Sequence, residues 1–140
     1  MYDRLFLAIL GTSSVHDDAS RKRYMKYGLT DGYPKIFYLL SCEEGVIQKQ
    51  LADSCGVKQA TLTVILKKME ANNWIRRERG LSSTGKAVYR VFLTDQGRAI
   101  SDSLEKEAEE LETIAFSGFT SDEKNMLLSM LSRVSDNMRL

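Results

Sequence analysis

The stretch from Gln48 to Lys67 reads Q-K-Q-L-A-D-S-C-G-V-K-Q-A-T-L-T-V-I-L-K and decides the fold. Two short helical patterns meet at Gly56, which accepts the positive φ of a sharp turn because it has no Cβ. Ala52, four residues earlier, is small enough to let two helices approach. Apolar residues lie on both sides of the turn: Leu51, Cys55, Val57, Leu62 and Ile65. The pattern predicts a helix-turn-helix, whose second helix lies in the DNA major groove. The alternative is an ordinary helical hairpin in a bundle.

Length and composition indicate one domain, or one domain with an attached assembly element. The chain has 140 residues, of which 43% are hydrophobic, enough for a packed core. It has no run of about 18 apolar residues and therefore no expected membrane span. No basic segment precedes the short apolar run from Leu5 to Leu10, so a secretory signal is not expected. Two cysteines make no disulfide framework, and we expect the protein in the reducing cytoplasm.

Charge is unevenly distributed along the chain. Residues 46–94 contain nine Lys and Arg but three acids, a formal charge of +6. The remainder contains 11 basic and 16 acidic residues, a charge of −5, so the overall charge is only +1. A basic middle that coincides with the helix-turn-helix indicates a face that binds a polyanion. The alternative is a solvated surface with uneven charge.

Helices are predicted before the central motif. Residues 2–27 favour a helix with a break or kink at Gly11–Ser14, because Gly and Ser are poor helix formers, and with Gly28 as its C-cap. Thr30 or Asp31 can cap the next helix, in which Pro34 suits the first turn.

A wing is predicted after the second helix of the motif, which we expect from about Lys58 to Asn72. Asn72-Asn73 closes that helix, since Asn accepts the left-handed conformation. Trp74-Ile75 and Val88 to Leu93 read as two strands joined by a flexible basic loop. A plain hairpin that only covers the core is the alternative.

Two more helices are expected at the C-terminal end. Thr94 caps the first, from Asp95 to about Ala115, and Thr120-Ser121-Asp122-Glu123 is a capping box that starts the second. Their apolar stripes, together with Leu5, Ile9 and Leu10, exceed what one small lobe can bury, which predicts a homodimer.

In this order of elements the chain resembles the MarR family of bacterial transcriptional regulators. Four segments carry the resemblance: Gly28-Leu29-Thr30, Gln48 to Val57, Thr61 to Ile75, and Leu93-Thr94-Asp95-Gln96-Gly97. The resemblance implies a mainly α winged helix-turn-helix fold with a small β wing. It implies a homodimer held by interlocking N- and C-terminal helices, here residues 1–30 and 98–140, around a DNA-binding lobe at 31–97. The wing would enter the minor groove, and many members respond to a small-molecule or oxidant effector.

The sequence departs from the family pattern at three places. Gly85-Lys86-Ala87 replaces an Asp-x-Arg of the wing, so Arg77 loses the acid that would orient it. Val64 stands where many members have an arginine, and Ile47 replaces a Thr or Ser cap.

The predicted DNA contacts come from the second helix and the wing. Gln can pair with adenine, and basic side chains bind phosphates. From the helix we expect Lys58, Gln59, Thr61 and Thr63, on the side opposite Leu62, Ile65 and Met69, together with Lys67. From the wing we expect Arg76, Arg77, Arg79, Lys86 and Arg90.

Other chemistry is weakly supported. With His16 the only histidine, neither a catalytic triad nor a metal cluster is expected, and no cofactor is predicted. Cys42 and Cys55 are read as structural thiols, with oxidant sensing as the alternative. Tyr33, Phe37 and Tyr38 are a predicted effector pocket, although aromatic residues at helical spacing also suit a core.

Two functions follow from these patterns. One is a dimeric, sequence-specific DNA-binding regulator, a repressor on a pseudo-palindromic operator that an effector can release. The other is a winged-helix protein-interaction module whose basic face binds an acidic partner.

Overall fold

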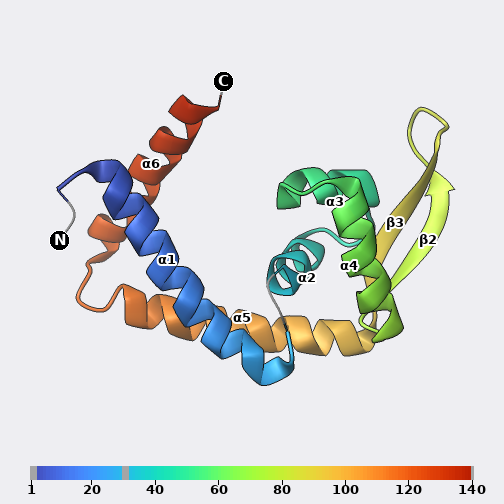
Figure 1. Ribbon diagram of the computed structural model, residues 1–140, viewed down its shortest axis with the longest axis horizontal. Coiled ribbons are helices and arrows are strands. Elements are labelled where there is room, and N and C mark those ends of the chain that lie inside the picture. The colour runs from blue at the N-terminus through green and yellow to red at the C-terminus, as the bar shows by residue number, and fades with distance from the viewer. Residues whose placement is uncertain (1–2, 30–31, 140) are drawn as a thin grey trace. The chain divides into compact units, whose positions relative to one another are not determined.

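The computed structural model describes residues 3–29 and 32–139, with the elements shown in Figure 1. Helix α1 (Leu5–Tyr24) continues into a 3-10 turn, η1 (Met25–Tyr27), followed by α2 (Tyr33–Cys42), β1 (Val46–Ile47), α3 (Gln48–Cys55) and α4 (Gln59–Ala71). Then come β2 (Ile75–Leu81), β3 (Ala87–Leu93), α5 (Asp95–Ala115) and α6 (Ser121–Met138). This mainly helical fold with one small sheet confirms the predicted fold class.

The chain divides into two compact units, residues 1–108 and residues 109–140. The first contains the helix-turn-helix, the sheet, α1 and most of α5. The second contains the last turns of α5 and all of α6. The predicted division into a lobe at 31–97 and dimerisation helices at 1–30 and 98–140 stays a prediction.

The core of the first unit is built from the helix-turn-helix and the elements around it. The largest fully buried side chains are Phe37, Ile36, Leu40, Leu51, Leu62, Leu66, Met69 and Val91. Helix α4 contributes three of them at positions 62, 66 and 69, which share one face at the helical spacing of i, i+4 and i+7. Of the predicted apolar set, Val57 lies at the surface, 36% exposed, because it follows Gly56 in the turn and points away from the core.

The sheet has three antiparallel strands in the order β1-β3-β2, one more than predicted. Val46 pairs with Val91 and Ile47 with Arg90. A two-residue strand has no periodicity of its own, and it forms only because β3 is beside it. Strand β2 also extends to Leu81, so residues that we predicted in the flexible loop lie in the sheet, and only residues 82–86 connect the strands. The wing consists of β2, residues 82–86 and β3.

The first helices differ from the prediction at one point. Helix α1 is continuous from Leu5 to Tyr24, so the break expected at Gly11–Ser14 is wrong. The unfavourable propensity of Gly and Ser is about 1 kcal/mol or less per residue, which the neighbouring turns outweigh. Gly28 is the C-cap as predicted, and Pro34 lies in the first turn of α2. The proposed caps Thr30 and Asp31 lie outside the described residues.

The start of α5 is hydrogen-bonded to, and packed against, the turn between α4 and β2. Thr94 Oγ1 accepts a hydrogen bond from the Gly97 amide, which confirms the predicted cap, and donates to the Asn73 carbonyl. Asn73 has the left-handed φ of 58° that we expected in this turn. Gly97 is buried against the turn, because a Cβ there would lie 1.9 Å from the Trp74 carbonyl oxygen. Only glycine permits this approach.

A buried carboxylate joins η1 to α5. Glu107 is 7% exposed and accepts hydrogen bonds from Lys26 Nζ at 2.5 Å, Arg23 Nη1 at 2.9 Å and the Tyr27 hydroxyl at 3.1 Å. The hydrogen bond from Lys26, supported by those from Arg23 and Tyr27, lowers the pKa of Glu107 below 4.5 although burial opposes this. A buried charge with these partners holds the end of the α1–η1 segment on α5.

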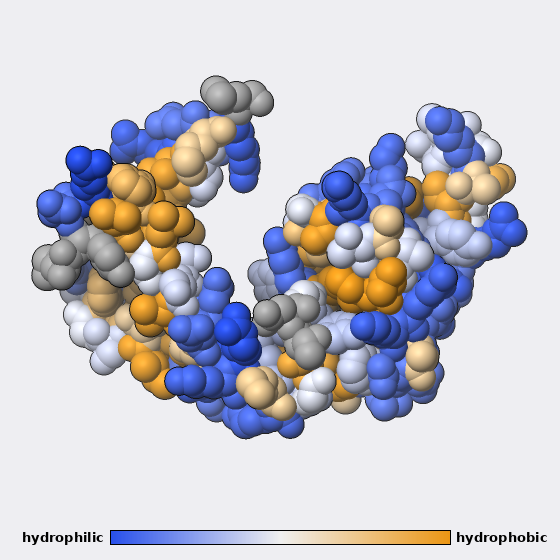
Figure 2. Space-filling model, viewed as in Figure 1, coloured by the Kyte–Doolittle hydropathy of each residue, from blue (hydrophilic) through white to orange (hydrophobic). Residues whose placement is uncertain are grey.

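Helix α6 starts with the predicted capping box. Thr120 Oγ1 accepts from the Glu123 amide at 3.1 Å, and the Glu123 carboxylate accepts from the Thr120 amide at 2.9 Å. Figure 2 shows apolar surface on α1 and apolar surface on α6. The exposed apolar side chains are Leu5, Phe6, Ile9, Leu10 and Val15 on α1 and Met126, Leu128, Met130, Leu131, Val134 and Met138 on α6.

Candidate nucleic-acid interface

The turn between α3 and α4 has the geometry of a helix-turn-helix. Gly56 is in the left-handed conformation with φ 69°, and the Val57 amide donates to the Ala52 carbonyl at 3.1 Å. Leu51 and Ala52 of α3 pack into the core with Leu62 and Leu66 of α4. The two helices are therefore fixed relative to each other, and the remaining face of α4 is free to meet a partner.

The exposed side of α4 carries most of the side chains predicted to contact DNA. Lys58 is the N-cap, and Gln59, Thr61 and Lys67 are exposed on the helix. Within the described part of the chain, these four side chains make no hydrogen bond or ion pair that would occupy them. They can bind phosphate or base edges without breaking an internal contact.

Thr63 belongs instead to a polar network at the side of α4. Its hydroxyl donates to the Gln59 carbonyl at 2.8 Å and accepts from Gln48 Nε2 at 3.0 Å. Thr63 is half-buried, since it lies about 100° around the helix from its neighbours Leu62 and Val64. Its hydroxyl is already satisfied by protein groups, so the structure places Thr63 beside the exposed face and not on it.

Arg77 extends this network from the wing. Arg77 donates through Nη2 to Glu70 Oε1 at 2.9 Å and through Nε to Glu70 Oε2 at 3.3 Å, and through Nη1 to Gln48 Oε1 at 3.4 Å. The Arg77 side chain is 18% exposed. We expected Arg77 to lack an orienting acid because the Asp-x-Arg is missing, and this is wrong: Glu70 of α4 supplies the carboxylate. A forked arginine–carboxylate pair is geometrically specific, so β2 is tied to α4 and α3.

The other arginines of the wing divide between the two faces of the sheet, because successive side chains of a strand point to opposite sides. Arg79 lies on the face of Arg77, with its guanidinium 5.8 Å from the centre of the Tyr89 ring. Arg76 lies on the opposite face, over the Phe92 ring at 4.3 Å and in an ion pair with Glu78. Arg90 also lies on that face.

Two residues of the wing differ in their availability to a ligand. Arg90 donates through Nη1 to the Gly45 carbonyl at 3.0 Å and is half-buried. Lys86 is exposed in the connection between the strands. The described residues offer neither Lys86 nor Arg79 an ion pair.

The ten predicted contacts thus form two groups. The first group, which we call the free set, has side chains available to a ligand: Lys58, Gln59, Thr61, Lys67, Arg79 and Lys86. The second group is engaged within the protein: Thr63, Arg76, Arg77 and Arg90. Sequence reasoning missed Gln48 and Glu70, which hold Thr63 and Arg77. No local pattern marks them, because their partners lie 7 to 29 residues away in sequence.

The three aromatic residues predicted to line an effector pocket lie in different surroundings. Phe37 is fully buried and packs against Trp74 at 5.7 Å between ring centres, so it is a core residue. Tyr33 is half-buried and meets the Trp74 ring edge-on, whereas Tyr38 is 63% exposed. These positions do not test an effector site, which stays a prediction.

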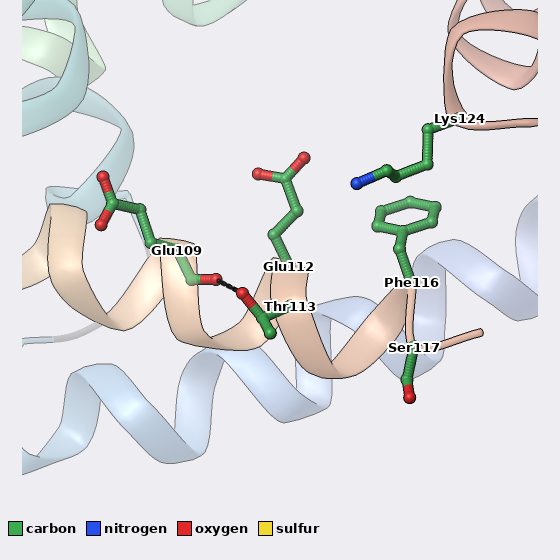
Figure 3. Close-up of a pocket in the computed structure, with 6 residues that line it drawn as sticks. All are labelled: Glu109, Glu112, Thr113, Phe116, Ser117 and Lys124. Carbon is green, nitrogen blue, oxygen red and sulfur yellow. Dashed lines mark hydrogen bonds between the residues drawn. The ribbon is translucent and has the colours of Figure 1, made fainter. Parts of the chain in front are cut away.

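One open hollow lies within the second unit (Figure 3). It has a volume of about 620 Å³ and is lined by Glu109, Glu112, Thr113, Phe116, Ser117 and Lys124. Lys124 extends from α6 toward Glu112, and the Phe116 ring forms part of the wall. None of the predicted aromatic residues lines it.

The two cysteines have different environments. Cys55 is half-buried, and burial raises the pKa of its thiol although the nearby Lys35 opposes this. A raised pKa keeps the thiol protonated and unreactive, in agreement with a structural role. Cys42 is exposed on α2, so the prediction that it is a buried structural thiol is wrong.

Comparison with known proteins assigns the family. The MarR family pattern matches residues 29–83. The uncharacterised HTH-type transcriptional regulator YybA of Bacillus subtilis is 31% identical over 124 residues, which cover 87% of this chain and 80% of YybA. A MarR-family transcriptional regulator from Silicibacter pomeroyi has a similar structure, with a TM-score of 0.77, 27% identity and coverage of 97% of this chain and 88% of that one. A MarR-family regulator from Listeria monocytogenes, solved with a 26-mer DNA, gives a TM-score of 0.80 at 25% identity and coverage of 99% and 90%.

These matches agree with the structure. The family pattern spans α2, the helix-turn-helix and β2, which are the elements that position most of the free set. Across residues 3–29 and 32–139, no helix has the length and apolar character needed to cross a membrane. From the order of its elements, the geometry of its turn and its similarity to these proteins, the chain belongs to the MarR family of transcriptional regulators.

Proposed function

We propose that the protein is a sequence-specific DNA-binding repressor that acts as a homodimer on a pseudo-palindromic operator. The observation that carries this proposal is the exposed side of α4. Polar and basic side chains there make no hydrogen bond or ion pair with the described residues, while Leu62, Leu66 and Met69 on the opposite side of the same helix are fully buried. An exposed face of this kind on the second helix of a helix-turn-helix suits the major groove.

Charge supports duplex DNA as the partner. Four members of the free set are cations, and they come from both α4 and the wing. Two of the three acidic residues in the segment 46–94 form ion pairs within the protein: Glu70 pairs with Arg77, and Glu78 pairs with Arg76. The cations that remain are thus those able to contact phosphates, which dominate affinity for DNA. The similar Listeria protein was solved in complex with a 26-mer DNA.

Dimerisation is supported by apolar surface. The four apolar side chains near the start of α1 and the six on α6 are all 38% exposed or more. Contiguous exposed apolar surface on a helix marks an interface, and both helices lie outside the helix-turn-helix. A two-fold dimer would present two copies of α4 to two half-sites about one helical turn of DNA apart. A small-molecule effector stays a prediction.

The proposal can be tested by selecting duplexes from a random pool and measuring binding by fluorescence anisotropy between 50 and 300 mM salt, about the range in which phosphate contacts dominate. We expect one enriched palindromic sequence, and affinity that falls steeply with salt. Lys67→Ala should weaken binding, whereas Lys106→Ala on α5 is a matched control that should not. Light scattering should give twice the mass of one chain.

Two outcomes would contradict the proposal. Binding to acidic polymers and duplexes alike without any selected sequence would favour the protein-interaction alternative. The mass of a single chain at micromolar concentration would remove the dimer, and with it the palindromic operator.

A further inference from the structure

The centre of the exposed face of α4 is apolar. Val64 comes two residues after Leu62 and two before Leu66, so its side chain points about 160° away from both of these fully buried residues. Its side chain is 54% exposed. Ala60, one turn earlier on the same face, is also exposed.

The surroundings of Val64 are polar and cationic. Lys67 and Lys68 follow it by three and four residues, and both are exposed. Gln59 lies near the start of the same helix. A single branched apolar side chain beside two lysines is a poor surface for an apolar protein partner, which would have to bury those charges. This surface is compatible with a polyanion that places a small apolar group against Val64 while its negative charges meet the lysines.

Duplex DNA has one such group in the major groove. The C5-methyl of thymine is the apolar feature of the base edges there, and it distinguishes A·T pairs from G·C pairs through contact with apolar side chains. A β-branched valine is also stiff about χ1, so it presents its methyl groups with little loss of conformational entropy.

We propose that Val64, together with Ala60, contacts the C5-methyl of one thymine in each half-site and thereby determines sequence choice at that position. This inference rests on the proposed function, because it needs α4 in the major groove. It assigns a specificity role to a position whose side chain cannot hydrogen-bond. Sequence reading at the centre of α4 then depends on shape and apolar contact, while Gln59 and Thr61 read polar base edges beside it.

The test replaces each thymine of the selected operator in turn with deoxyuridine, which removes the methyl group alone. At one thymine per half-site, replacement by deoxyuridine should lower the affinity of the wild-type protein for the operator about fourfold. This is the effect expected when one methyl-sized group is no longer buried. With Val64→Ala, thymine and deoxyuridine at that position should bind almost equally. Val64→Thr keeps the shape and one methyl group and should retain part of the discrimination.

The control is Lys106→Ala, which truncates an exposed side chain of α5 and should keep the full difference between thymine and deoxyuridine. Because Val64 is exposed, the Val64 variants should melt at the wild-type temperature. An unchanged pattern of deoxyuridine effects in Val64→Ala would overturn the inference while leaving DNA binding intact. Failure of the wild-type protein to select any duplex would instead overturn the proposed function, and the inference with it.

Discussion

Removing the link between Arg77 and Glu70 should loosen the wing from α4 without removing a DNA contact. We consider Arg77→Met, which keeps the aliphatic stem but loses all donors, and Glu70→Gln, which keeps the shape but loses the charge. Arg77 makes two hydrogen bonds to Glu70 and one to Gln48, with 18% of its side chain and 38% of the Glu70 side chain exposed.

The magnitude lies between two known limits. Fully exposed ion pairs are worth about 0.2–1 kcal/mol, and hydrogen bonds to charged groups about 1.5–3 kcal/mol. The forked geometry and partial burial place the pair with Glu70 near the upper end of the first range, and Arg77→Met also loses the hydrogen bond to Gln48. We therefore expect Arg77→Met to lower the free energy of unfolding by about 1.5 kcal/mol, and the double-mutant cycle to give a coupling energy of about 1 kcal/mol.

The cycle is measured by urea denaturation of the wild type, the two single variants and the double variant. All four are measured at one protein concentration, because the stability of a dimer depends on concentration. The coupling should decrease in 1 M salt, since exposed charges are screened within about 3 Å there. Arg77→Met should leave the slope of log affinity for DNA against log salt unchanged. A coupling near zero, together with a slope shallower by about 0.9 for each phosphate that is no longer neutralised, would show that Arg77 leaves Glu70 to bind phosphate.

Three other predictions concern single sites. Gly97→Ala should destabilise the protein by about 3 kcal/mol or more, because its Cβ would overlap the Trp74 carbonyl oxygen at 1.9 Å, whereas Gly80→Ala, with open space around it, should change the denaturation midpoint little. Lys86→Ala should weaken binding to specific and random duplexes alike, with a salt slope shallower by up to about 1.8 for the dimer; weakening confined to one operator would mean that Lys86 reads sequence. The lowered pKa of Glu107 means that its charge stabilises the fold at pH values above its unfolded pKa, and that this stabilisation is lost as pH falls through the folded pKa below 4.5. Urea midpoints measured from pH 7 to pH 3 should therefore fall more steeply in the wild type than in Glu107→Gln, and parallel curves would contradict this.

Local signals in the sequence predicted the parts of the fold that depend on neighbouring residues. The glycine turn at Gly56, the cap at Thr94 and the capping box at Thr120 each involve hydrogen bonds within five residues. Helix α4 was predicted within one residue of its bounds, because its buried residues repeat with the helical period.

The parts that were missed depend on contacts between distant segments. Strand β1 is two residues long and forms only through pairing with β3, 43 to 45 residues later. Most of β2 reads as a loop because arginines and a glutamate follow one another with no apolar period, and its pairing with β3 decides its structure. Arg77 likewise finds its acid on another element, so a missing Asp-x-Arg in the wing does not show that the arginine is unsupported.

The register of the wing explains why its charges have different uses. Near its base, Arg77 faces α4 and is neutralised by Glu70, while on the other face Glu78 lies directly opposite Arg90 and pairs with Arg76. The arginines near the base therefore hold the wing in place and add little net charge. Cations without an acidic partner among the described residues occur further out, at Arg79 and in the connection at Lys86. The replacement of Asp-x-Arg by Gly85-Lys86-Ala87 thus leaves a lysine at the tip of the wing, while Glu70 orients Arg77. Two functions that one motif would otherwise combine are therefore separated: Arg77 and Glu70 hold the base of the wing, and Lys86 supplies a flexible positive charge at its tip.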